Sequence, residues 1–315
     1  MKLEKLRNAF LRGSLEKRLY WQLVRENYTR ILPQIQSVLK DNNEVMSIEM
    51  RKDGIVLKKA DGVMLYFDFT QSICRAEIEL LMDGDPEKND MLFINRYLDE
   101  HENSSILDIG ANVGIFSLYF YHAHHNLKCY LFEPVHNTFQ WLLKNAQLNH
   151  VNENRYFPFN IGMSDEKGSF DFYVPASNEA ASLVANDDSF YRKKATEYGD
   201  YTGSTEIDKI VCNVDTIDSF TASHTIDNIS FIKIDVEGNE LKVLRGAENT
   251  LKQHRPLVYC ELLRKHAKRF GYHPNDVINY MRDLGYICKT MRNAELYEVT
   301  EITEETVETN FFFEY

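Results

Sequence analysis

The chain has 315 residues, and 43% of them are hydrophobic, which is enough to bury a large core without disulfides or a structural metal. Its formal net charge of −12 argues against a general electrostatic attraction to nucleic acid or to anionic membranes, so no nucleic-acid partner is expected. The five cysteines never form a C-x-x-C pair, and we expect reduced, buried thiols. No apolar run is long enough for an integral membrane span, and no secretory signal is recognisable, which predicts a cytoplasmic protein.

The N-terminal part of the chain is expected to form an extension ahead of the main domain. Apolar residues recur at helical spacing over residues 1–40, with interruptions at Gly13 and near Pro33. Residues 45–69 alternate between apolar and polar side chains and predict a small antiparallel meander. The helices are expected to pack on the main domain or on a second subunit, so a homo-oligomer is left open. The expected division is residues 1–72 for the extension and residues 73–315 for the main domain.

Residues 104–120, with the sequence SSILDIGANVGIFSLYF, predict a buried strand, a tight turn and a helix. Gly110 and Gly114 allow the sharp reversal and the close approach of a ligand that a Cβ atom would obstruct. A helix that begins at the turn directs free N–H groups and the positive end of its dipole into the same cleft. A polar or charged ligand is therefore expected at this turn.

The residues within this turn narrow the choice of ligand. A dinucleotide fingerprint anchored on Gly110 requires glycine at the positions of Asn112 and Ile115, and no Gly-Lys-Ser/Thr phosphate-binding loop is present. Asp108, at the end of the strand, would repel a pyrophosphate but suits the ammonium group of an amino acid. The pattern Asp108-x-Gly110-x-Asn112-x-Gly114 resembles that of class I S-adenosylmethionine-dependent methyltransferases, which implies that these four residues bind the cofactor.

The next two predicted strands supply further candidates for this site. Glu133 ends the strand that follows Asp108, where an acidic residue can accept hydrogen bonds from both ribose hydroxyls. Asn160 and Ile161 close the third strand and are expected to offer an amide and an apolar wall to the adenine. Residues 176–206 are polar and poor in periodicity, which predicts a long loop that is either functional or mobile and leaves a short helix open.

Strands and helices alternate through the rest of the chain, which predicts right-handed crossovers and a mostly parallel sheet. The most distinctive segment is residues 231–256, an apolar strand followed by a turn at Gly238 and a helix. Asp235 and Glu237 stand at the end of this strand and are expected to face the ligand crevice. The alternative is that both are solvated turn residues at the start of the helix.

This segment and the earlier turn closely resemble the FkbM family of methyltransferases. The family pattern lysine-x-aspartate-x-glutamate-glycine-x-glutamate is met by Lys233, Asp235, Glu237, Gly238 and Glu240. The resemblance covers about residues 76–265. It implies a class I methyltransferase fold, which is a Rossmann-like α/β fold with a mostly parallel seven-stranded sheet whose last strand is antiparallel, here with an N-terminal helical and β-hairpin extension.

The resemblance also implies S-adenosylmethionine as the methyl donor and O-methylation of a hydroxyl on a sugar, glycan, lipid-linked or natural-product acceptor. Asp235 and Glu237 are the candidates for base or substrate alignment, with Glu261 as a third carboxylate and His266 as an alternative base. A divalent ion held by clustered carboxylates is left open, and no metal ligand is assigned.

Three other functions remain to be separated from this one. The first is methylation of nitrogen or of a protein side chain. The second is a non-catalytic nucleotide-binding or scaffolding protein that retains the fold. The third, an NAD-dependent redox enzyme, is disfavoured because Asn112 and Ile115 break the dinucleotide fingerprint.

Overall fold

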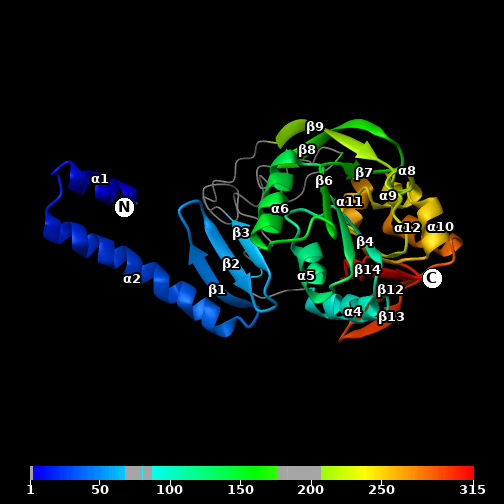
Figure 1. Cartoon of the computed structure of the whole chain (residues 1–315), viewed down its shortest axis with the longest axis horizontal. Coiled ribbons are helices and arrows are strands. Elements are labelled where there is room, and N and C mark those ends of the chain that lie inside the picture. The colour runs from blue at the N-terminus through cyan, green and yellow to red at the C-terminus, as the bar shows by residue number, and fades with distance from the viewer. Residues whose placement is uncertain (1–2, 68–79, 81–86, 176–182, 184–206) are drawn as a thin grey trace.

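Eight strands form the central sheet of the computed structural model, in the order β13-β12-β14-β11-β10-β4-β5-β6 (Figure 1). The structure describes residues 3–67, 80, 87–175, 183 and 207–315. In sheet order the strands are Glu295–Glu298 (β13), Ile287–Arg292 (β12), Asn310–Glu314 (β14), Leu257–Glu261 (β11), Ile229–Ile234 (β10), Ser105–Ile109 (β4), Lys128–Phe132 (β5) and Tyr156–Phe159 (β6).

The pairing of these strands confirms the predicted fold class. β6, β5, β4, β10 and β11 are parallel, whereas β14 is antiparallel to both β11 and β12. All residues of β4 and β10 are buried, as expected for strands that are covered on both faces. The seven predicted strands are present, and β13 adds an eighth as the hairpin partner of β12.

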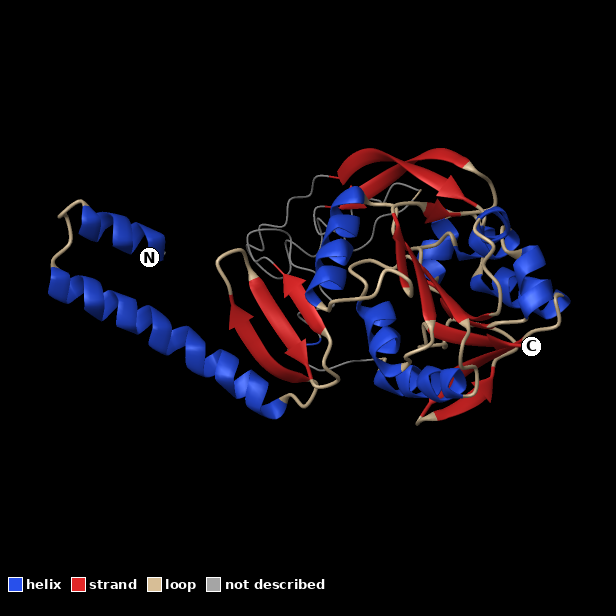
Figure 2. Ribbon diagram, in the orientation of Figure 1, coloured by secondary structure: helices blue, strands red, loops and turns tan. Residues whose placement is uncertain are grey.

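Helices cover both faces of the sheet (Figure 2). One face packs against Lys88–Asp99 (α4), Ile115–Ala123 (α5) and His136–Leu148 (α6). The other packs against Ile217–Ser223 (α8), Glu240–Arg245 (α9), Glu248–His254 (α10) and Pro274–Asp283 (α12), with Arg264–Arg269 (α11) beside them. Successive strand residues alternate between the two cores: Ile106 belongs to the first, and Leu107 and Ile109 belong to the second.

The helix predicted after β10 is broken into α9 and α10. The break falls at Gly246, where an added Cβ atom would lie 2.0 Å from the backbone oxygen of Ser164. Close contact with a distant turn therefore requires glycine at this position. Such a contact between remote segments could not be read from helical periodicity.

A second sheet of three strands stands apart from the central one. It consists of β7, β9 and β8 in that order, with the bounds Gly162–Met163 (β7), Gly168–Pro175 (β8) and Ile207–Asp215 (β9). The run that contains Cys212 was expected to continue the alternation of the main domain, but it pairs with β8 instead. The loop predicted over residues 176–206 lies outside the described residues, except for Leu183.

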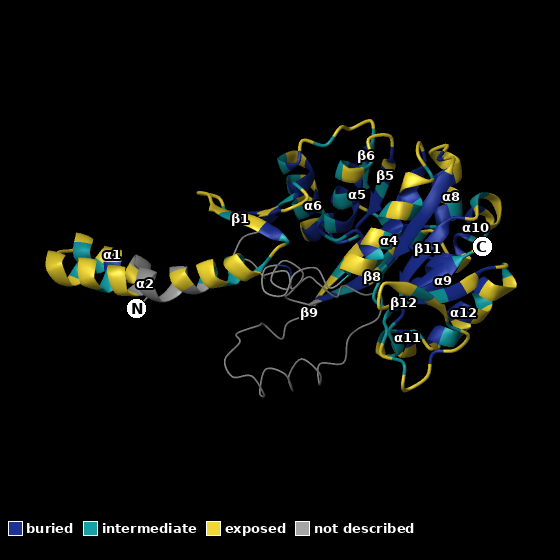
Figure 3. Ribbon diagram, turned by 90° about the horizontal axis from the view of Figure 1, so that it is seen from below, coloured by how far each residue is buried: buried dark blue, intermediate teal, exposed yellow. Residues whose placement is uncertain are grey.

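The N-terminal part contains the predicted helices and meander. They are Leu3–Leu11 (α1), Lys17–Asp41 (α2), Val45–Met50 (β1), Ile55–Lys59 (β2) and Met64–Phe67 (β3). α2 continues through Pro33, where a break was expected, and loses only the hydrogen bond that proline cannot donate. The two helices extend away from the body of the protein, and much of their described surface is exposed (Figure 3).

The small sheet β1–β3 packs directly on the main domain. Leu57 and Leu65 are fully buried in the same core as Ile106. Asn145 of α6 and Asn149, which follows its last residue, accept hydrogen bonds from backbone N–H groups of β3, at 2.7 and 2.8 Å. The sheet therefore shares its core with residues beyond the expected boundary at residue 72, and a separate extension over residues 1–72 stays a prediction.

Two further expectations concern the whole chain. Cys129, Cys212, Cys260 and Cys288 are buried free thiols, as expected, while Cys74 lies outside the described residues. Within the described ranges, no helix combines the length and the apolar character needed to cross a membrane. The cytoplasmic location stays a prediction.

We expect Asn145→Ala to lower the free energy of unfolding by about 2–4 kcal/mol, because it leaves two buried backbone groups without partners. The fully buried Asn145 side chain accepts from Tyr66 N–H at 2.7 Å and donates to the Val113 carbonyl at 2.9 Å. Gln147→Ala, at an exposed position of the same helix, is the matched control and should cost less than about 0.5 kcal/mol. Urea unfolding measures both, and equal effects would contradict the role given to Asn145.

Candidate active site

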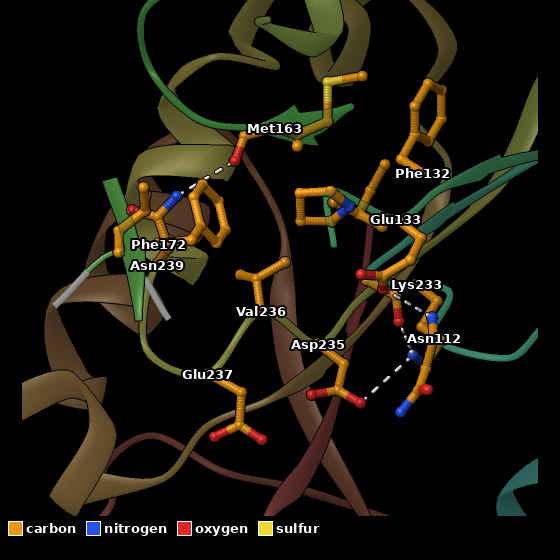
Figure 4. A pocket seen from close by; sticks show the side chains of 15 residues that line it. Asn112, Phe132, Glu133, Met163, Phe172, Lys233, Asp235, Val236, Glu237 and Asn239 are labelled. Carbon is orange, nitrogen blue, oxygen red and sulfur yellow. Dashed lines mark hydrogen bonds and ion pairs between the residues drawn. The ribbon is translucent and has the colours of Figure 1, made fainter. Parts of the chain in front are cut away.

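An open cavity lies at the carboxyl ends of β4, β5 and β10 and has a volume of about 760 Å³ including its mouth (Figure 4). This is the edge of the sheet where an open α/β fold binds its ligands. The lining residues are Ile109, Gly110, Asn112, Phe132, Glu133, Pro134, Gly162, Met163, Phe172, Leu183, Lys233, Asp235, Val236, Glu237 and Asn239.

The turn after β4 is held against the turn after β10. Gly110 has φ +79°, and a Cβ atom there would lie 1.9 Å from the backbone oxygen of Asp235. Gly114 has φ +87° and precedes α5, where a Cβ atom would approach the Tyr156 hydroxyl to 2.9 Å. The sequence predicted that both glycines make room for a ligand. The structure gives the protein's own packing as the reason, although Gly110 also lines the cavity.

Asp108 is fully buried and does not line the cavity. Ser117 Oγ donates to its Oδ2 at 2.6 Å, and Lys233 Nζ lies 3.6 Å from its Oδ1. Burial raises the pKa of Asp108, and the neighbouring lysine and serine only partly oppose this effect. The carboxylate faces α5 and the lysine, and the predicted contact between Asp108 and a ligand ammonium group stays a prediction.

Lys233 occupies the position between this buried carboxylate and the cavity. Its Nζ lies 3.3 Å from both the Gly110 carbonyl and Asp235 Oδ2. Burial by itself would lower the pKa of Lys233, but Asp235 and Asp108 outweigh it and raise the pKa, so the side chain stays charged. No role was expected for Lys233 beyond its place in the family pattern. Its signal was a lysine within an otherwise apolar strand.

Glu133 lies where it was predicted, at the end of β5 and in the cavity wall. Its Oε2 accepts from Asn112 N–H at 3.1 Å and its Oε1 from Val135 N–H at 2.8 Å. Burial raises the pKa of Glu133 to about 7. Each carboxylate oxygen can accept a second hydrogen bond, so both remain suited to the two hydroxyls of a ribose.

Asn160 and Ile161 do not line this cavity, and their contact with an adenine stays a prediction. The Asn160 amide donates to the carbonyls of Glu133 and Pro134, at 2.8 and 3.0 Å. The next two residues along the chain, Gly162 and Met163, line the cavity in their place. Strand ends predicted from a sequence are commonly displaced by about two residues, as here.

Three predicted carboxylates gather at the other side of the cavity. Asp235 and Glu237 line it, while Glu261 lies behind them at the end of β11. Burial, and then the charges of Asp235 and Glu237, raise the pKa of Glu261 to about 9. His266 Nδ1 lies 2.9 Å from Glu237 Oε2, so the histidine that the sequence offered as an alternative base is brought into this group.

The backbone that carries Glu237 is strained and is stabilised by Glu240. Glu237 has φ +56°, and the following Gly238 has φ +112°. Glu240 Oε1 accepts from Gly238 N–H and its Oε2 from the Tyr272 hydroxyl, both at 2.8 Å. Glu240 is 3% exposed, and burial raises its pKa to about 7. The last glutamate of the sequence pattern therefore supports the turn and does not line the cavity.

Comparison with known proteins identifies the family of this chain. Residues 108–288 match the Methyltransferase FkbM domain, which is more than half of the chain. The chain belongs to the FkbM family. The predicted resemblance is thus confirmed, and with it a family of S-adenosylmethionine-dependent methyltransferases.

Individual proteins resemble only part of this chain, and at low sequence identity. Methyltransferase 1 of Beauveria bassiana (strain ARSEF 2860) is 26% identical over 150 residues, which cover 47% of this chain and 60% of that protein. The hexuronic acid methyltransferase AglP of Haloferax volcanii is 26% identical over 191 residues, or 60% of this chain and 66% of that protein. The chain thus spans 60% and 66% of the lengths of these two curated relatives. The crystal structure of methyltransferase FkbM from Methylobacillus flagellatus KT is 14% identical, with a TM-score of 0.40 over 91% of this chain and 60% of that one.

The residues of this FkbM domain fit S-adenosylmethionine. Two amide oxygens in the cavity wall, Asn112 Oδ1 and Asn239 Oδ1, are buried and have no hydrogen-bond partner within the described part of the chain. Each can accept from an N–H group of a ligand. Phe132, Met163 and Phe172 form an apolar wall between them and suit an adenine ring.

Glu240→Gln should stabilise the domain progressively as the pH rises from about 5 to 8. Folding raises the pKa of Glu240 from 4.5 to about 7, so the folded state binds its proton more tightly, and this contribution to stability is lost as the pH passes about 7. The glutamine is neutral throughout and should gain up to about 3 kcal/mol on wild type at pH 8.

Urea unfolding at several pH values tests this expectation. Glu166→Gln, at an exposed site, is the control and should follow wild type at each pH. A Glu240→Gln difference that does not change with pH would show that Glu240 is not destabilised by its ionisation.

Proposed function

We propose that this chain transfers a methyl group from S-adenosylmethionine to a hydroxyl of a sugar, glycan, lipid-linked or natural-product acceptor. One observation carries the proposal. The cavity of this FkbM domain has Glu133 on the side of β5 and the pair Asp235 and Glu237 on the side of β10. A carboxylate that suits ribose hydroxyls and two candidate reactive carboxylates therefore face one cavity.

Glu133, Asn112 and Asn239 are the residues proposed to hold the donor. Glu133 would accept from the ribose hydroxyls, and the two free amide oxygens would accept from ligand N–H groups. The ammonium group of Lys233 partly balances the negative charge of Asp235 on the side of β10. S-adenosylmethionine supplies a methyl group on a sulfonium, and the electron pair of the broken C–S bond stays on sulfur as a neutral thioether.

The carboxylates are proposed to orient the acceptor and to take its proton. Asp235 lies in the cavity wall with a side chain that is 40% exposed, so an acceptor hydroxyl can reach it. The hydroxyl proton passes to the carboxylate while the oxygen becomes bonded to the methyl carbon. Glu237 is the second candidate, and its pairing with His266 gives the proton a further acceptor. Glu261 is the third candidate and acts from behind Glu237.

A carbohydrate acceptor is supported by one relative in particular. The Haloferax volcanii protein is a hexuronic acid methyltransferase, and its similarity covers 60% of this chain. We therefore place uronic acids and their glycosides first among candidate acceptors. Positioning and deprotonation of a weak nucleophile are the main tasks of such a site.

Asp235→Asn should lower kcat by about 100-fold or more, because the amide cannot accept the proton. Its affinity for S-adenosylhomocysteine should stay within about threefold of wild type, since Asp235 is assigned to the acceptor. Methyl transfer from labelled donor to uronic acids, neutral sugars, amines and peptides measures the rate, and calorimetry measures the affinity.

Asp171→Asn is the control for this variant. Asp171 is an aspartate of β8, half-exposed and paired with Lys209, and its variant should retain wild-type kcat. Transfer to amines or peptides alone would contradict O-methylation. An unchanged kcat for Asp235→Asn would remove Asp235 as the base, and no transfer to any acceptor would favour a non-catalytic protein.

A further inference from the structure

Glu237, Glu261 and His266 form a cluster of metal-ligand type beside the cavity. Their ligand atoms all lie within 4.8 Å of one another. From this geometry we propose that the three residues bind a divalent first-row transition cation such as Mn²⁺ or Zn²⁺. Binding of the cation stands on the cluster alone, whereas its role in catalysis rests on the proposed function.

The three side chains come from separate elements that converge on one point. Glu237 belongs to the turn after β10, Glu261 ends β11 and His266 lies in α11. His266 Nδ1 is already 2.9 Å from Glu237 Oε2. Ligand atoms around a four-coordinate zinc lie about 3.3 Å apart, given bond lengths of about 2.0–2.1 Å. Small side-chain rotations are therefore enough to close the three ligands around a cation.

Carboxylates are concentrated around Glu261. In the described ranges, the Glu261 side chain makes no hydrogen bond and no ion pair, and four carboxylates act on it: Asp235, Glu237, Glu240 and Glu87. Lys233 is engaged by Asp108 and Asp235. Arg269 donates to the backbone carbonyl of Glu237. A bound cation would compensate this group of acids.

The donor set determines which cations fit. Two carboxylates and one imidazole combine oxygen and nitrogen ligands, and imidazole is a poor ligand for Mg²⁺ and Ca²⁺. Transition cations that accept both donor types should therefore bind more tightly. Three protein ligands also leave at least one coordination position open, which is typical of catalytic sites.

The site could take part in the proposed reaction because Glu237 also lines the cavity. An acceptor hydroxyl in the open position would have a lowered pKa, and its proton would pass to Asp235 as the oxygen takes the methyl group. The rival use of the same residues is a metal-free proton relay from Glu237 to His266. The two uses differ in whether the resting protein binds a cation.

The test is a direct binding measurement on the full chain, freed of metal with a chelator and without donor or acceptor. Calorimetric titration with MnCl₂ and ZnCl₂ should show one equivalent bound, with MgCl₂ and CaCl₂ at least tenfold weaker. Glu261→Gln and His266→Gln should each weaken Mn²⁺ binding by at least tenfold. Electron paramagnetic resonance of Mn²⁺ provides a second readout, and circular dichroism verifies that each variant is folded.

Two controls match the substituted residues in type. Glu248→Gln removes a surface carboxylate paired with Lys252, and His150→Gln removes an exposed histidine. Both should bind Mn²⁺ like wild type. No saturable binding by wild type, or equal binding by Glu261→Gln and wild type, would overturn the proposal. Affinity for S-adenosylhomocysteine, measured separately, shows whether the donor site has failed as well.

Discussion

The ammonium group of Lys233 lies between Asp108 and Asp235, and the arrangement of the cavity depends on this interaction. Lys233 and Asp108 are direct neighbours across the parallel strands β10 and β4. Without the lysine, Asp108 would be a fully buried carboxylate with no opposite charge, which costs several kcal/mol. The same lysine contacts Gly110 and Asp235, so it joins the two turns that form the cavity wall.

The two turns separate the cavity into two chemical environments. On the side of β5, Glu133 is held by backbone N–H groups and faces an apolar wall, which suits a nucleoside. On the side of β10, Asp235 and Glu237 collect negative charge that Lys233 only partly balances. Glu240 accepts a hydrogen bond from Gly238 N–H and so holds the strained backbone that follows Glu237. The proposed division into a donor side and a reaction side thus rests on which residues end β5 and β10.

Local sequence patterns predicted the features that depend on neighbouring residues. The strand and turn at Asp108, the position of Glu133 and the strand that ends before Asp235 all follow from hydrophobic runs and turn residues, and the structure places them at one edge of the sheet. The features that were missed depend on contacts between distant segments. Lys233 pairs with Asp108 across two strands, and Gly246 breaks a predicted helix because Ser164 lies against it.

The central claim is that one cavity holds the methyl donor between Glu133 and the carboxylates after β10. A crystal structure with S-adenosylhomocysteine tests it most directly. We expect the ribose hydroxyls within hydrogen-bond distance of Glu133 and the sulfur directed toward Asp235 and Glu237. A nucleoside bound elsewhere, or a sulfur directed away from both carboxylates, would contradict the account.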